Sequence, residues 1–197
     1  LSWYPHGRDV SATSQVMLHV STSVLYQVFG AGSTLYDFTI LFPAVIGSPT
    51  TIVVFALVRG IGGTSAGLLA SLFFAICLPI VFRGTIGWFK SEPLGLFYGL
   101  LAVYLLLSGI KSDKGKVSVA KIVGAGILLA LGLASWGGIQ FFIMPIGIFF
   151  LALPFLRKDN NFIIWTSVIF TAVFILITMS FEKTGIAFAS SLGGFFL

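Results

Sequence analysis

The strongest constraint on the fold of this chain is a series of apolar stretches, each about as long as a membrane-spanning helix. A helix needs roughly 20 mostly apolar residues to cross a hydrocarbon layer about 30 Å thick, because it rises about 1.5 Å per residue. The joints between the stretches are short and polar or glycine-rich, so neighbouring helices must run antiparallel. The sequence predicts six spans, at residues 38–57, 62–81, 93–110, 118–136, 138–156 and 162–180.

Composition supports an all-α, polytopic membrane protein. Apolar residues make up 57% of the chain and charged residues only 9%, with a mean hydropathy of +1.08, whereas soluble domains are far more polar. The formal net charge of +5 is explained by helix orientation and requires no nucleic-acid partner. The single cysteine, Cys77, lies in an apolar run, so it can form neither an internal disulfide nor a cysteine metal cluster.

The chain is expected to divide into three regions. Residues 1–37 are an external loop with an amphipathic surface helix, 38–180 are the transmembrane helical domain with its six spans, and 181–197 begin a later external loop. The surface helix is predicted at 14–29, a stretch too short to span a membrane. Its polar residues recur at intervals of three and four and are expected to face water or lipid head groups: Gln15, His19, Thr22, Ser23 and Tyr26. The chain begins without Met and ends on "GGFFL", so both termini are expected to be truncated.

Charge predicts the orientation of the spans, because cytoplasmic loops carry an excess of Lys and Arg. One side of the predicted membrane carries Arg59, Lys111, Lys114, Lys116, Lys121, Arg157 and Lys158, and the other carries Arg8, Arg83, Lys90 and Lys183. The second, less basic side is therefore expected to be extracytoplasmic. It also holds three acidic residues, Asp9, Glu92 and Glu182.

The loop "RGTIGWFKSEPLGLFYG", residues 83–99, gathers Arg83, Lys90 and Glu92 on that side. In a chain with so few charges, such a loop is either a solvated connection between two membrane helices or the rim of an active site that faces water. Residue types alone leave both interpretations open.

Three motifs, in this order and spacing, resemble the catalytic subunit of oligosaccharyltransferase in its archaeal form. They are "WYPHGR" at 3–8, the "AGLLA" helix followed by Arg83 and a short charged loop, and "SWGG" at 135–138. The resemblance covers nearly the whole chain. It implies a membrane fold of the GT-C type and an integral cell-membrane protein. The implied activity is a glycosyltransferase that moves a lipid-linked oligosaccharide to Asn in the Asn-X-Ser/Thr sequence of an acceptor polypeptide.

The resemblance also implies a divalent cation, Mn²⁺ or Mg²⁺, as cofactor. The amide nitrogen of Asn is a poor nucleophile because its lone pair is delocalised, and a cation with several carboxylates can polarise the amide and neutralise the departing phosphate. Hard cations prefer oxygen ligands. The family's first-loop acidic pair is expected before Leu1, and its acceptor-recognition domain after Leu197. This chain alone is therefore expected to be inactive.

Four residues are carried over from the family as site residues. The family's second external loop carries an acidic residue, any residue and a second acidic residue. The corresponding residues of this chain are Lys90, Ser91 and Glu92. Glu92 is the predicted metal ligand and catalytic carboxylate, and Arg83 is predicted to orient the acceptor or balance the acidic site. Trp136 and Lys90 are predicted substrate-binding residues. Lys90 departs from the family pattern: either Glu92 reaches the metal alone, with Lys90 toward phosphate, or this copy is weak or inactive.

Each of these residues also has an interpretation without function. Glu92 precedes Pro93 and can act as a helix cap that complements the helix dipole, for about 0.3–1 kcal/mol. Arg83 and Lys90 can be interfacial charges, and Trp136 can belong to an aromatic belt.

Two other functions stay open at this point. One is another glycosyltransferase that uses polyprenyl-phosphate sugars, which needs no acceptor-recognition domain. The other is a transporter subunit, but the spans contain acidic residues only at their margins, Asp37 and Asp159, and no internal repeat is visible.

Overall fold

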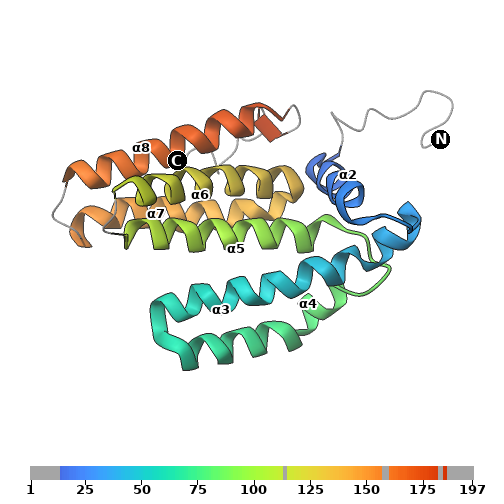
Figure 1. Ribbon diagram of the computed structural model, residues 1–197. Coiled ribbons are helices and arrows are strands. Elements are labelled where there is room, and N and C mark those ends of the chain that lie inside the picture. The colour runs from blue at the N-terminus through green and yellow to red at the C-terminus, as the bar shows by residue number, and fades with distance from the viewer. Residues whose placement is uncertain (1–13, 113–114, 157–159, 182–183, 186–197) are drawn as a thin grey trace.

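The computed structural model describes residues 14–112, 115–156, 160–181 and 184–185, and within these ranges the chain is helical without strands. The motif "WYPHGR" and the charged residues Arg8, Asp9, Lys114, Arg157, Lys158, Glu182 and Lys183 lie outside the described residues. The predicted all-α membrane fold is confirmed (Figure 1). The elements are α2 (Met17–Phe29), α3 (Leu35–Ile76), α4 (Leu78–Arg83), α5 (Ser91–Ile110), α6 (Gly115–Ser135), the 3₁₀ turn η1 (Gly137–Ile139), α7 (Gln140–Leu156) and α8 (Asn160–Met179).

Four stretches of the described chain are long and apolar enough to cross a membrane. The stretches that qualify by length and composition among the described residues are Leu35–Ile76, Ser91–Ile110, Gly115–Ser135 and Gly137–Phe155. A shorter apolar segment, Ile164–Met179, lies within α8. The first stretch is 42 residues long, about twice the length of one crossing.

The 42 residues of α3 fold back on themselves at Gly63. The backbone at this residue has φ 86° and ψ 179°, a conformation that only glycine adopts without strain. Figure 1 shows the two arms of α3 side by side, with the bend at one end of the bundle. Two of the predicted spans therefore correspond to the two arms of α3.

The second predicted span, 62–81, is not one continuous helix. The return arm of α3 ends at Ile76, Cys77 is extended with ψ 120°, and α4 starts at Leu78 with Pro79 in its first turn. Proline has no backbone N–H to donate to the preceding turn, so the break lies just before it. The short helix α4 then carries Arg83 at its last residue.

Helix α5 packs closely against α6 through small residues. A Cβ atom on Gly132 would lie 3.3 Å from Cβ of Tyr98, and one on Gly109 would lie 3.1 Å from Ile122. The Ser118 hydroxyl donates to the Gly109 carbonyl at 2.7 Å across the same interface. Small residues allow such close approach in membranes, where helices associate by packing and not by the hydrophobic effect.

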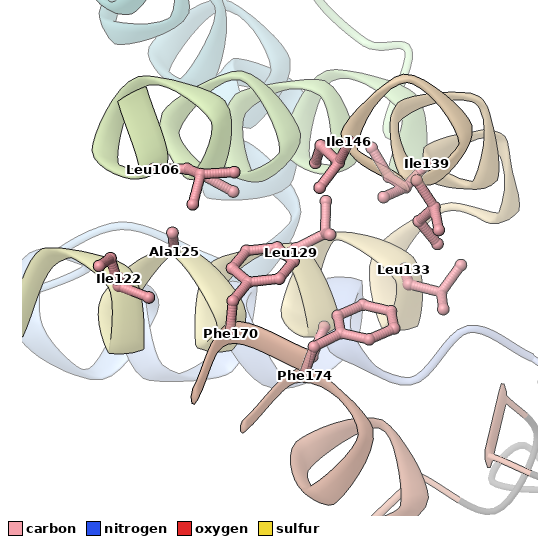
Figure 2. Packing of buried hydrophobic residues seen from close by; sticks show 12 residues of the cluster. Leu106, Ile122, Ala125, Leu129, Leu133, Ile139, Ile146, Phe170 and Phe174 are labelled. Atoms are coloured by element: carbon pink, nitrogen blue, oxygen red, sulfur yellow. The ribbon is translucent and has the colours of Figure 1, made fainter. Parts of the chain in front are cut away.

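The main core lies between α5, α6, α7 and α8. Figure 2 shows Leu129 of α6 at its centre, with Leu106 of α5 on one side and Phe170 and Phe174 of α8 on the other. The two phenylalanine rings stack with centroids 6.5 Å apart. A smaller cluster joins α2, α3 and α5 through Leu18, Phe42, Ile46 and Leu94.

Helix α2 differs from its prediction in the direction of Thr22. His19 is exposed, as expected, but Thr22 is only 4% exposed and does not face solvent. Its hydroxyl donates to the Leu18 carbonyl at 2.8 Å, so its hydrogen-bonding demand is met within the helix and burial costs little. Ser21, next to it, meets the Tyr98 hydroxyl of α5 at 3.2 Å.

We expect Gly63→Ala to lower the free energy of unfolding by about 1–3 kcal/mol, because alanine is strained at this positive φ. Gly60→Ala is the matched control, since Gly60 lies in the same segment without a positive φ and a Cβ there meets nothing within 4 Å. Denaturant titration of the intact protein in mixed micelles measures both. Equal stabilities of the two variants would contradict the glycine-dependent bend.

Candidate active site

A cavity of about 390 Å³ lies where α3, α4, α5 and the turn after α6 meet. Three of the four predicted site residues line it: Arg83 from the end of α4, Glu92 from the start of α5, and Trp136 from the turn between α6 and α7. The rest of its wall is mostly apolar and consists of Gly47, Thr50, Phe74, Pro79, Ile80, Gly84, Pro93 and Leu96. The structure thus brings together three predicted site residues that are up to 53 positions apart in the sequence.

Arg83 and Glu92 form an ion pair in this cavity. Nη1 of Arg83 lies 3.1 Å from Oε1 of Glu92, and the two side chains are 55% and 24% exposed. A pair with one partner so exposed contributes roughly 0–1 kcal/mol to stability, so its main effect is to orient the carboxylate. The other oxygen, Oε2, is buried and has no hydrogen-bond partner among the described residues.

Glu92 is held at the start of a helix. Lys90 is the N-cap of α5, with no hydrogen bond from its side chain, and Glu92 lies in the first turn. A carboxylate there is favoured by the helix dipole by about 0.3–1 kcal/mol. A helix-dipole role for Glu92 is therefore compatible with an Oε2 that has no hydrogen-bond partner among the described residues.

The loop between α4 and α5 is docked on α3. The N–H of Gly87 donates to the Ile40 carbonyl at 3.0 Å, and Phe89 packs edge-on against Phe42 with ring centroids 5.6 Å apart. Gly87 has a φ of 86°, which glycine adopts readily. These contacts fix the distance between Arg83 and Glu92, which lie on either side of the loop.

Lys90 does not line the cavity. Its ammonium lies 5.6 Å from the ring centroid of Trp88, and its side chain is exposed. Among the described residues, the ion-pair partner of the Glu92 carboxylate is Arg83, and the predicted role of Lys90 at a phosphate stays a prediction.

The side chain of Trp136 is seated between glycines of two helices. A Cβ atom on Gly95 of α5 would lie 2.5 Å from Cβ of Trp136, and one on Gly138 would lie 2.4 Å from its ring. Any larger residue would therefore displace Trp136. Gly138 of "SWGG" and Gly95 of α5 leave the space that allows the Trp136 side chain to reach the cavity.

Sequence reasoning missed Gln15 as part of this region. It was expected on a water-facing side of the surface helix, but it lies against the turn that carries Trp136. With its amide nitrogen oriented toward α6, it donates to the Ser135 carbonyl at 2.7 Å, and its oxygen accepts from the Gly137 N–H at 2.6 Å. A long-range contact of this kind leaves no local signal in the sequence. Gly95 was missed for the same reason.

The residues present supply only part of a divalent-cation site. No group of three or more His, Cys, Asp or Glu side chains lies together among the described residues. Glu92 offers one unpartnered oxygen, and a hard cation in a protein takes about six oxygen ligands, some of which can be water. The described residues fit a single ligand of such a site, not a complete one.

Comparison with known proteins found a family model that matches almost the whole chain. The family model described as "Oligosaccharyl transferase STT3, N-terminal" matches residues 1–196. The chain is 28% identical over 155 residues to rice (Oryza sativa subsp. japonica) "Dolichyl-diphosphooligosaccharide--protein glycosyltransferase subunit STT3B". That match covers 77% of this chain and 21% of the rice protein, so the chain spans about a fifth of that relative.

Solved structures share the fold. The archaeal oligosaccharyltransferase AglB from Archaeoglobus fulgidus, in complex with an inhibitory peptide and a dolichol-phosphate, is similar with a TM-score of 0.67 and 19% identity, over 91% of this chain and 24% of that one. The Archaeoglobus fulgidus oligosaccharyltransferase complexed with Zn and sulfate is similar with a TM-score of 0.68 and 20% identity, over 91% of this chain and 26% of that one. The matching sequence is from a plant and the matching structures are archaeal, so the predicted archaeal form stays a prediction.

We expect Gly95→Ala to destabilise the protein by about 1–3 kcal/mol, because the added methyl group overlaps the root of the Trp136 side chain. Gly47→Ala, in the wall of the same cavity, adds a methyl group that meets nothing within 4 Å and is the control. Thermal unfolding of the intact protein in detergent compares the two. A Gly95→Ala protein as stable as Gly47→Ala would contradict the tight seat of Trp136.

Proposed function

Because this chain belongs to the oligosaccharyl transferase STT3 family and matches its N-terminal part, we propose that it forms the membrane portion of an enzyme for protein N-glycosylation. The reaction transfers an oligosaccharide from a lipid carrier to the side-chain amide of Asn in an Asn-X-Ser/Thr sequence. The observation that carries the proposal is that Glu92, whose Oε2 has no hydrogen-bond partner among the described residues, lines one cavity together with Arg83 and Trp136.

The carboxylate of Glu92 is suited to orient an acceptor. Arg83 holds Oε1 at 3.1 Å, so the remaining lone pairs point in a restricted set of directions. Oε2 is then available to accept from an amide N–H of the acceptor or to bind a cation. Arg83 is half exposed and retains donors beyond the one bound to Glu92, which can reach an acceptor carbonyl or a phosphate oxygen.

The family implies a divalent cation, Mn²⁺ or Mg²⁺, and Glu92 would supply one of its ligands. The other ligands would come from residues outside the described ranges. When bound, the cation supplies positive charge that neutralises the phosphate leaving group. The related archaeal enzyme has been solved with Zn and sulfate, which supports a cation and an anion site in this family.

The apolar wall of the cavity suits a lipid carrier. Phe74, Pro79 and Leu96 lie beside the charged pair, so a polyprenyl chain can pack there while its phosphate stays near Arg83. The related enzyme that holds a dolichol-phosphate and an inhibitory peptide supports a lipid phosphate and an acceptor peptide as the partners. The bilayer is the third partner, and the proposal includes no nucleic acid.

We propose that the end of the bundle with Arg83 and Glu92 lies on the extracytoplasmic side of the cell membrane. Arg59 and Lys111 lie together at the other end, and the positive-inside rule makes that end cytoplasmic. Membership of a transferase family disfavours a transporter subunit. A different glycosyltransferase that uses polyprenyl-phosphate sugars is the remaining alternative, and it would not use an Asn-containing peptide.

The test of this function is a transfer assay with the full-length protein, a lipid-linked oligosaccharide and a peptide that contains Asn-X-Thr. We expect glycopeptide with the Asn peptide and none with a matched Gln peptide. Absence of transfer in the wild type together with transfer by Lys90→Asp would assign this copy as inactive through Lys90. Absence in both proteins would contradict the proposed function.

Glu92→Gln keeps the size of the side chain but removes its charge. We expect transfer to fall at least tenfold, about 1.4 kcal/mol in the barrier, with little change in thermal stability. Asp37→Asn is the matched control, because Asp37 is also a first-turn carboxylate, of α3, but lies outside the cavity. A manganese and magnesium titration completes the measurement. An unchanged rate with unchanged metal dependence would leave Glu92 as a helix-end residue only.

Arg83→Ala removes the group that orients the carboxylate. We expect the KM for the acceptor peptide to rise about fivefold, because Glu92 is then free to adopt several rotamers. Trp136→Phe should instead alter the affinity for the lipid substrate modestly and leave the peptide KM unchanged. Steady-state kinetics with each substrate varied in turn separates the two effects. Near wild-type values for both variants would reduce these residues to membrane anchors.

A further inference from the structure

A second, larger cavity lies at the opposite end of the helices. Its volume is about 700 Å³, and its wall comes from the end of the first arm of α3, the end of α5 and the end of α7. It shares no lining residue with the candidate active site. The residues that line it are Phe55, Ala56, Leu57, Arg59, Gly60, Ile61, Tyr104, Leu107, Ser108, Ile110, Lys111, Phe149 and Leu153.

This cavity is basic. Arg59 and Lys111 line it directly, and a third cation, Lys121 of α6, donates to the hydroxyl of the lining residue Ser108 at 2.8 Å. The lining contains no carboxylate, and the one ion pair within the described part of the chain joins Arg83 to Glu92 at the other end. Two acidic residues of the adjoining connections, Asp113 and Asp159, lie outside the described residues.

The cations are held in place by neighbours that do not neutralise them. The Arg59 guanidinium lies 5.8 Å from the ring centroid of Phe55, and the Lys111 ammonium donates to the Gly60 carbonyl. Both side chains are exposed. The positions of these charges are therefore defined, while an anion can still reach them.

The remaining wall is apolar. Leu107 of α5 and Phe149 and Leu153 of α7 continue from the charged rim along the helices. A free anion such as phosphate would make no contact with this apolar wall. A molecule with a charged head group and a hydrocarbon chain would contact both the basic rim and the apolar wall. Basic pockets between transmembrane helices are known to bind anionic lipid head groups.

We propose that this cavity binds an anionic phospholipid, with its head group between Arg59 and Lys111 and an acyl chain along Phe149 and Leu153. The proposal does not rest on the proposed enzymatic function. The lipid belongs to the cytoplasmic leaflet, where the charge asymmetry of the chain places this end. It bridges α3 and α5 beside the contact that Lys111 already makes with the bend of α3, so binding stabilises the hairpin of α3 against the bundle.

The test compares lipids on the full-length protein in an uncharged detergent. Dioleoylphosphatidylglycerol should raise the unfolding temperature in a saturable way, and dioleoylphosphatidylcholine should not. Glycerol 3-phosphate carries the charged head without the chains and should give no rise. Native mass spectrometry should show one retained phosphatidylglycerol. An equal rise with phosphatidylcholine, or the full rise with glycerol 3-phosphate, would overturn the proposal.

The matched variants remove one positive charge each at the same end of the bundle. Arg59→Gln and Lys111→Gln should each weaken the apparent affinity for phosphatidylglycerol at least fivefold, and Arg59→Lys should retain most of it. Lys116→Gln is the control, because Lys116 is exposed on α6 and does not line the cavity. The readout is the lipid-dependent increment, so a lower starting stability does not affect it. Equal loss in Lys116→Gln, or no loss in the other two, would contradict a site at this cavity.

Discussion

The rest of the structure depends on the close approach of α5 and α6. In lipid there is no hydrophobic driving force between helices, so two helices stay together only where their surfaces fit closely. Gly109 and Gly132 allow this fit, Gly95 leaves room for Trp136 directly after α6, and the Ser118 hydroxyl adds a hydrogen bond across the interface. The pair forms the frame on which α8 packs through Phe170 and Phe174 (Figure 2).

Helix α5 also connects the two ends of the molecule. Its first turn holds Glu92 in the candidate active site, and Lys111 follows its last residue in the basic cavity. The first arm of α3 runs beside α5 and the return arm runs back beside the first, so the bend at Gly63 lies at the basic end and Arg83, after the return arm and α4, reaches the other end (Figure 1). A shift of α5 would therefore change both cavities at once. This is a physical reason for the tight glycine contacts along its length.

Part of the candidate site was predictable from the sequence, because charges are rare in a membrane chain. Arg83, Glu92 and Trp136 were identified from motif resemblance and from their place at the ends of apolar stretches, and all three line one cavity. Lys90 was predicted to bind substrate; it does not line this cavity, its ammonium lies 5.6 Å from the ring centroid of Trp88, and its role stays a prediction. The predicted direction of Thr22 was wrong, because an intrahelical hydrogen bond allowed the residue to be buried.

The sequence by itself determined that this chain is a helical membrane protein, because the length of an apolar stretch and the thickness of a bilayer leave few other solutions. It also indicated that Arg83, Glu92 and Trp136 lie near helix ends. Only the tertiary structure decided that Arg83 pairs with one oxygen of Glu92 and leaves the other free, and that Gln15 braces the turn of Trp136. It alone brought Arg59 to Lys111 across 51 intervening residues. The physical reason is that these contacts depend on how helices pack side by side, and local periodicity carries no information on which faces meet.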